Sequence, residues 1–240
     1  MTSLARNTGL RLLACAFFLV VFAAHAQQTV FNVPSADIMD KGKTYLEWDT
    51  LLGDSSPSAA VTPRTVHGLG HGIETGINVS SFNAPVSGPI FAVPTIKWKF
   101  YESTKHGLVL FAGDNVVLPI RQRTFNVGNA VYLEAAKTFS SKTRIGVGIY
   151  DFSAQVIDHA NRAGIQASLE QEITPRFAVA ADWYSGNNSV GFVTPGLVTK
   201  VSGTVTLLTA CEMGNHDLMQ GNHAILLVLG WNPAWGHSAH

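Results

Sequence analysis

The sequence has few cysteines, few charges and only one long apolar run. Cys15 and Cys211 are the two cysteines in 240 residues. Cys15 lies in an N-terminal segment that we expect to be removed, so Cys211 is left alone and an internal disulfide is excluded. Charged residues make up 13% of the chain, against about 25% in typical soluble domains. No second run of about 18 apolar residues occurs, so the sequence predicts no membrane-spanning helix.

The single apolar run predicts an export signal. Arg6 and Arg11 precede the run Leu12–Ala23, and an A-x-A cleavage site ends at Ala26. This order of segments is typical of a secretory signal peptide, which we assign to residues 1–26. A membrane anchor is the first alternative, but the run is short for one. A lipoprotein site at Cys15 is the second, and it would leave most of the apolar run on the mature chain.

The charge of the mature chain excludes some classes of partner. Removal of Arg6 and Arg11 leaves 14 Lys and Arg residues against 16 Asp and Glu residues. A chain this close to neutrality has neither the basic excess of a nucleic-acid-binding protein nor the acidic excess of a solvated tail.

Nearly all residues after Lys43 alternate with period two between apolar and polar or small side chains. Ile145, Val147 and Ile149, for example, alternate with Arg144 and three small or aromatic residues. This period is typical of β-strands, and glycines inside the runs disfavour helices. We expect about twelve strands, near residues 43–51, 62–70, 73–82, 90–101, 107–119, 125–139, 143–152, 162–173, 176–185, 190–201, 204–213 and 223–231.

The domain organisation follows from the same pattern. We expect a single β-domain over residues 43–231, preceded by a periplasmic lead-in at 27–42 that is not a strand, and followed by a tail at 232–240. The connections tend to alternate between short turns and longer loops. We therefore place the loops at 53–61, 153–161 and 214–222 together on the outer side.

The alternation separates charged from apolar side chains. One face of the expected strands collects ionisable residues, which are our candidate lumen-lining residues: Glu47, Asp49, Glu74, Lys97, Lys99, Glu134, Arg144, Glu170, Glu172 and Asp182. The other face is apolar, as in the segment "TIKWKF", where Ile96, Trp98 and Phe100 alternate with two lysines. A soluble β-sandwich and a membrane barrel both fit this division. Long strands with aromatic residues near their ends favour a single up-and-down antiparallel transmembrane β-barrel.

The chain resembles a small Gram-negative outer-membrane β-barrel of the porin-like kind. The resemblance rests on the signal peptide, the segment "VFNVPSADIMDKGKTYLEWD", the alternating strands and the end "HAILLVLGW". It implies an outer-membrane location, contact with membrane lipid, and a last strand that the barrel-insertion machinery reads at Leu227, Leu229 and Trp231. The tail after Trp231 departs from the family pattern, in which the chain ends on the aromatic residue.

The expected function is a narrow passive pore for small solutes or ions with a charged lumen. A non-transporting structural or adhesive barrel and a soluble secreted β-sandwich are the alternatives. A lipid-acting outer-membrane enzyme, with Ser and His on the outer wall near one rim, is a further alternative, but no nucleophile elbow or His-x-Ser-like cluster indicates one. We expect no enzyme, no cofactor and no nucleic-acid partner.

Two histidine-containing segments are better explained by turns than by metal binding. "VHGLGHGIE" has His67 and His71 four residues apart, which on a strand separates them by about 13 Å. "GNHDLMQGNH" could bring His216, Asp217 and His223 together on an ion, but its Gly, Asn and Asp residues are also ordinary turn residues. We therefore expect no metal site.

Overall fold

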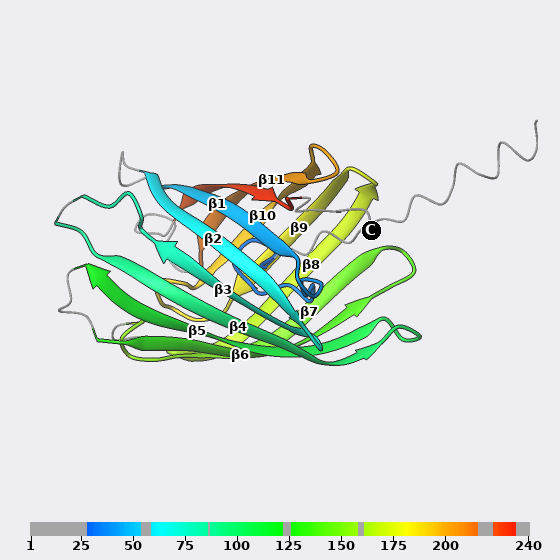
Figure 1. Cartoon of the computed structure of the whole chain (residues 1–240), viewed down its shortest axis with the longest axis horizontal. Helices are drawn as coiled ribbons and strands as arrows, with labels where there is room; N and C mark the ends of the chain where they lie inside the picture. Colours follow the sequence, from blue (N-terminus) through cyan, green and yellow to red (C-terminus); the bar gives the residue numbers. More distant parts are fainter. Residues whose placement is uncertain are drawn as a thin grey trace, which may run out of the picture.

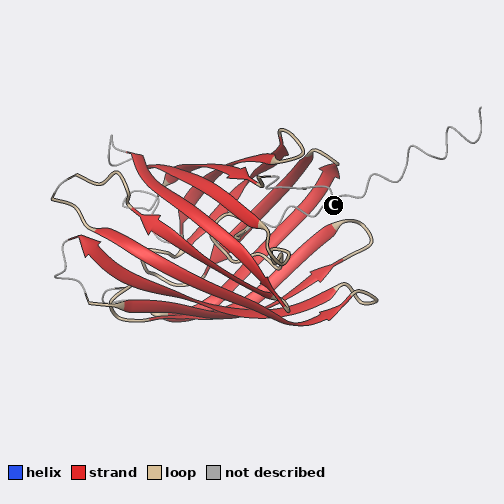
Figure 2. Cartoon of the chain, in the orientation of Figure 1, coloured by secondary structure: helices blue, strands red, loops and turns tan. Residues whose placement is uncertain are grey.

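The computed structural model describes residues 28–53, 59–85, 87–121, 126–157, 161–215 and 223–233. The expected signal peptide, residues 1–26, and most of the tail, residues 234–240, lie outside this range. Every regular element in the described residues is a β-strand (Figure 2). The described residues contain no helix that is long and apolar enough to span a membrane.

Twelve antiparallel strands form a closed up-and-down barrel (Figure 1). Each strand pairs with its neighbours in the sequence, and β1 pairs with β12 to close the sheet. The strands are β1 Thr44–Gly53, β2 Ala59–Gly70, β3 Ile73–Ser80, β4 Ile90–Ser103, β5 Leu108–Arg121, β6 Gly128–Thr138, β7 Thr143–Phe152, β8 Ala163–Thr174, β9 Phe177–Tyr184, β10 Phe192–Lys200, β11 Val205–Gly214 and β12 Ala224–Trp231. The predicted fold class and number of strands are confirmed. A sandwich of two sheets is wrong, because one closed sheet contains every strand of the described residues.

The two ends of the barrel differ in their connections. At one end, which we call the short-turn end, β1 begins, β12 ends and the connections are tight. The β2–β3 connection there consists of His71 and Gly72, whose φ angles of 55° and 74° suit a two-residue hairpin turn. The connections at the other end, the long-loop end, span residues 54–58, 81–89, 122–127, 153–162, 185–191 and 215–223. The segment "VHGLGHGIE" is thus a hairpin.

The alternation of β4 shows how the wall is built. Lys97 is 3% exposed, whereas its neighbours Ile96 and Trp98 are 50% and 51% exposed. Lysine is therefore inside and the bulky apolar residues are outside, the reverse of a water-soluble protein. Large apolar side chains are likewise exposed on the outer faces of the other strands, including Ile149 on β7 and Leu229 on β12. Such an outer surface is suited to lipid rather than water.

Asp114 on β5 is an exception on the outer face. It lies directly opposite Ile96 on β4 and Val131 on β6, and both of these side chains are exposed. The row of paired residues through Asp114 runs from the short-turn end of the barrel to the long-loop end and consists of Thr44, His67, Thr75, Ile96, Asp114, Val131, Asp151 and Ala163. Asp114 occupies the fifth of these eight positions, so it lies near the middle height of the wall.

The interior of the barrel contains residues 28–42, drawn in blue inside the wall in Figure 1. Four apolar clusters fill the inside, and each contains at least one residue of this segment. Val30 and Phe31 pack against β9, β11 and β12, while Val33 packs against an aromatic cluster on β6, β7, β9 and β10. Ala36 and Met39 take part in the other two clusters. From the sequence we expected a periplasmic lead-in at 27–42 that is not a strand, and its packing inside the barrel was not predicted.

Candidate functional site: the lumen and the segment that crosses it

The segment begins with a tight loop over Gln28–Ser35. The backbone N–H of Val30 donates to the carbonyl oxygen of Val33 at 2.8 Å, and that of Ser35 donates to the carbonyl oxygen of Gln28 at 3.1 Å. Thr29 and Pro34 form an isolated antiparallel bridge between these two bonds. We call residues 28–35 the plug loop, because this loop contacts strands on opposite sides of the lumen.

Asp182 on β9 holds the tip of the plug loop. The backbone N–H groups of Phe31, Asn32 and Val33 all donate to its Oδ2 atom, at 2.9, 2.5 and 2.8 Å. Asp182 is 1% exposed, so its negative charge is stabilised by three backbone dipoles in place of water. Three consecutive N–H groups that converge on one oxygen form an anion-binding nest.

Asn32 extends the same attachment to the next two strands. Its side-chain amide donates to Thr194 Oγ1 on β10 at 3.1 Å and to Glu212 Oε1 on β11 at 2.9 Å. The ring of Phe31 lies over Gly196 of β10, where a Cβ atom would approach the Phe31 Cζ atom to 2.6 Å. The tip of the loop is therefore held by polar contacts and by apolar packing on one side of the barrel.

The base of the plug loop is attached to β3 and β4. Lys97 Nζ donates to the carbonyl oxygens of Gln28 and Ser35 at 3.3 and 3.1 Å, and it forms an ion pair with Glu74 Oε1 at 2.9 Å. The Oε2 atom of Glu74 accepts a 2.7 Å bond from the backbone N–H of Met39. Lys97 and Glu74 thus bind both the base of the loop and the chain that follows it.

These two sets of contacts lie on opposite sides of the barrel. In the closed order of twelve strands, β4 and β10 are separated by six positions in either direction. A loop that contacts Lys97 on β4 and Thr194 on β10 must cross the full width of the lumen. The plug loop therefore lies across the path through the barrel.

Asp37 attaches the segment nearer the short-turn end. Arg144 on β7 donates two bonds to its carboxylate at 2.7 and 2.9 Å, and a further bond to Glu170 on β8 at 2.8 Å. Burial of Asp37 opposes its ionisation, but the adjacent guanidinium, with smaller contributions from Lys97 and Lys99, outweighs burial and holds the pKa of Asp37 below its usual value.

The remaining predicted lumen residues also lie on inward faces. Glu47 and Asp49 on β1 contact Arg64 of β2, at 3.5 and 2.5 Å. Glu134 on β6 accepts a bond of 2.6 Å from the Gln166 side chain.

Two predicted residues lie at the short-turn rim. Lys99 pairs with Glu102 at 2.6 Å, and Glu172 pairs with the half-exposed Lys142 at the same distance. The structure thus brings Glu74, Lys97, Arg144, Glu170 and Asp182 into contact with the internal segment or its ion pairs, and leaves the other predicted residues on separate parts of the wall.

A hollow of about 510 Å³ occupies the short-turn mouth of the barrel. Residues 36–40 of the internal segment line it, together with Lys43, Lys99, Glu102, Arg144, other residues of β1, β5 and β6, the β10–β11 turn and the residues that follow β12. Because the segment lines this hollow, water that enters the mouth reaches residues 36–40 directly. We call this hollow the vestibule.

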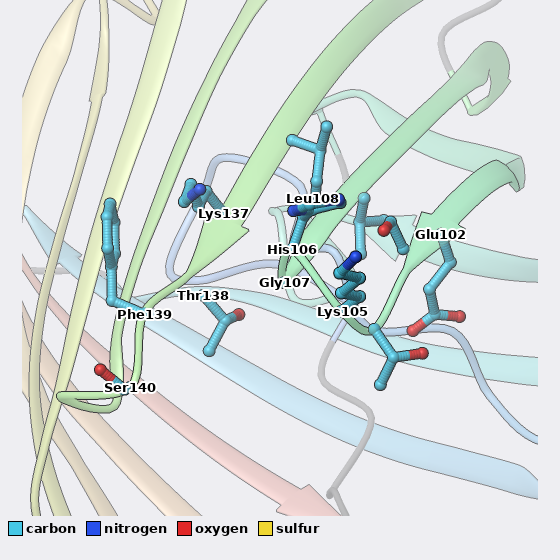
Figure 3. Close-up of a pocket in the computed structure, with 12 residues that line it drawn as sticks. Glu102, Lys105, His106, Gly107, Leu108, Lys137, Thr138, Phe139 and Ser140 are labelled. Atoms are coloured by element: carbon cyan, nitrogen blue, oxygen red, sulfur yellow. The ribbon is translucent and has the colours of Figure 1, made fainter.

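A second hollow of about 600 Å³ lies on the rim between the β4–β5 and β6–β7 turns (Figure 3). Lys105, His106, Leu108 and Phe139 are among the residues that line it, and the Lys137 ammonium lies 5.5 Å from the centre of the Phe139 ring. Its walls belong to two adjacent turns, so it is separate from the path across the plug loop.

The histidine segments are not assembled into a metal centre in the described residues. His67 contacts the Thr44 hydroxyl at 3.0 Å, and no group of three or more His, Cys, Asp or Glu side chains in the described part of the chain could hold a metal ion. His216 and Asp217 lie outside the described residues.

Sequence reasoning missed the residues that hold the segment by its backbone. Thr194 and Glu212, and the N–H groups of residues 31–33, carry no signal in the local pattern. One signal was present: Val30, Val33, Ala36 and Met39 repeat every three residues, and all four side chains are buried.

No protein-family model and no curated protein matches the chain. Solved structures do match. KdgM porin in complex with disordered oligogalacturonate has a TM-score of 0.61 at 7% identity, over 79% of this chain and 99% of that one. A second structure of KdgM porin gives 0.58 at 6% identity, over the same shares. The outer membrane protein Omp33 of Acinetobacter baumannii gives 0.50 at 8% identity, over 80% of this chain and 99% of that one. The chain therefore has the closed β-barrel fold that these proteins share.

Proposed function

We propose that the protein is an outer-membrane barrel that lets small solutes or ions pass through a narrow, charged lumen. The observation that carries this proposal is the division of the wall, with ionised side chains inside and bulky apolar side chains outside. A barrel of about eight strands is filled by its own side chains, and one of 16 strands leaves an open channel. Twelve strands leave room for a segment, and for water once that segment is absent.

The inward charges favour cations over anions. Lys97 and Arg144 are each bonded to acidic partners. The inward carboxylates of Glu134, Asp182 and Glu212 have no cation within ion-pair distance among the described residues. Where water reaches these carboxylates they ionise, and a lumen lined by ionised acids attracts cations and repels anions.

Current measurements in planar lipid bilayers test the proposal. We expect purified, folded protein, or a variant without residues 28–39, to carry current with a reversal potential that indicates cation preference. Glu134→Gln should weaken that preference because it removes one unpaired inward charge. Asp151→Asn is the matched control. It also replaces a carboxylate by an amide, but on the exposed outer face, and it should leave the cation preference unchanged. No current above background from either form of the barrel would contradict the pore.

The crossing of the lumen by the plug loop favours a second candidate, a non-transporting structural barrel. In that case the segment would be a permanent core, and its removal would prevent folding without opening a path. The variant without residues 28–39 distinguishes the two candidates. A folded variant that carries current favours the pore, and a variant that does not fold favours the structural barrel.

A further inference from the structure

We propose that residues 28–39 are a displaceable plug, and that strands β3, β4, β7 and β9–β11 form an internal binding site for this extended segment. The proposal rests on the proposed pore, because a segment across the lumen matters for transport only if solutes pass there. It goes further by assigning the inner wall a specific peptide ligand, which is part of the same chain.

The contacts are those of a bound ligand rather than of a continuous sheet. Residues 28–42 add no strand to the barrel, and in the described chain their regular pairing is limited to two isolated bridges. The polar attachments are made by side chains of the wall, above all Asp182, Lys97 and Arg144. The wall strands form their complete ladder without the segment, so its departure breaks no strand pairing.

The route of the segment permits withdrawal. The chain leaves the plug loop at Ser35, passes Asp37 and Met39, and joins β1 at the short-turn end. Residues 36–40 already line the vestibule at that end. The segment is tethered there, so we expect it to leave and return through the short-turn mouth.

Withdrawal exposes charged groups to water. Asp182 and Glu212 on one side and Lys97 with Glu74 on the other would lose their bonds to residues 28–39 and become hydrated. These are the groups that water hydrates most strongly, so the cost of breaking the contacts is partly offset. The vacated lumen has acidic groups on one side and a neutral ion pair opposite.

Current recordings on three forms of the full chain test the plug. Asp182→Asn should raise the open fraction about tenfold, equivalent to about 1.4 kcal/mol, because the amide cannot match a carboxylate as acceptor for three N–H groups. Asp151→Asn makes the same change on the outer face and should leave the open fraction unchanged.

Ala36→Cys/Ala136→Cys in a Cys211→Ala background joins the segment to β6 within one buried cluster. Once oxidised, this variant should stay closed, and reduction should reopen it.

A peptide of residues 28–39 added to a variant lacking those residues tests the binding site. It should block the current from the short-turn side only. A current that is already maximal in the wild-type protein and equal in all variants would overturn the plug while leaving the pore intact.

A labelling experiment decides the plug even if the barrel carries no current. In the Cys211→Ala background, Ala180→Cys places a thiol on β9 at a buried position in the cluster of Val30 and Phe31. It should react slowly with a water-soluble maleimide, and the addition of Asp182→Asn should speed the reaction about tenfold. Equal rates would show that the segment is not displaced. Heat-dependent gel mobility confirms that each variant is a folded barrel.

Discussion

Asp37 and Arg144 illustrate how single side chains hold the internal segment by charge. Their two hydrogen bonds of 2.7 and 2.9 Å join the segment to β7, and the arginine also contacts Glu170. Hydrogen bonds to charged groups typically contribute about 1.5–3 kcal/mol. Both side chains are about one-fifth exposed, which places the net contribution at the lower end of that range.

The pKa of Asp37 gives this contribution a pH dependence. The pKa lies below its ordinary value of 3.8 in the folded protein, so the stabilisation is fully present above that value and is lost as the pH falls through the lower, folded-state pKa. We expect Asp37→Asn to lower the thermal unfolding temperature equally at pH 7 and pH 5. The difference from wild type should shrink below pH 3.8. A difference that already disappears between pH 7 and pH 5 would contradict the assignment.

Asp114 offers a second test at the residue scale. Its Oδ1 atom is buried without a hydrogen-bond partner in the described structure, and its side chain shares the outer face with Ile96 and Val131. A lipid-facing Lys or Arg at mid-height costs about 2–4 kcal/mol, and Asp costs less. Asp114→Leu should therefore stabilise the barrel in bilayers, measured by urea unfolding in lipid vesicles. Asp151→Leu, nearer the long-loop end, should give a smaller gain. A loss of stability at Asp114 would show that its carboxylate has a partner.

At the scale of elements, the alternation within strands was predictable and the internal segment was not. The period-two alternation predicts that Lys97 points inward and Trp98 outward, and only the adjacent residues are needed to see it. The structure has Lys97 buried and Trp98 exposed. The anchor of Phe31 at Asp182 spans 151 positions and uses a backbone N–H, and every residue except proline carries such a group. Local sequence therefore could not indicate it. Asp114 was also missed, because a single carboxylate among apolar residues is compatible with either face.

At Gly68 on β2 the backbone of the internal segment lies directly against the wall. A Cβ atom there would overlap the backbone oxygens of Met39 and Asp40, which precede the parallel bridge between Lys41 and Gly68. Gly68→Ala should displace residues 39–41 and lower stability by about 1–3 kcal/mol. Gly53→Ala is the matched control, because a Cβ atom at Gly53 meets nothing within 4 Å. Equal unfolding temperatures for the two variants would show that residues 39–41 do not pack against Gly68.

At the scale of the whole molecule, the two ends of the barrel should face different compartments. The short turns and the mouth with the internal segment share one end, and the six longer connections share the other. Bacterial outer-membrane barrels have short periplasmic turns and longer outer loops. An epitope inserted at Ser58, between β1 and β2, should be labelled on intact cells. The control insertion at Ser141, in the β6–β7 turn, should be labelled only after permeabilisation. The reverse pattern would invert the orientation.

The long reach of the plug loop also orders events in time. The bonds from Phe31 and Asn32 end on residues 151 and 180 positions later in the chain. Contacts of such large sequence separation form late, because the chain between them must first be ordered. Residues 28–35 emerge early in synthesis, yet their binding site exists only after β9, β10 and β11 have joined the sheet. Docking of the plug loop therefore follows assembly of the barrel. Amide hydrogen exchange at residues 31–33 should slow only after β1 and β12 have paired.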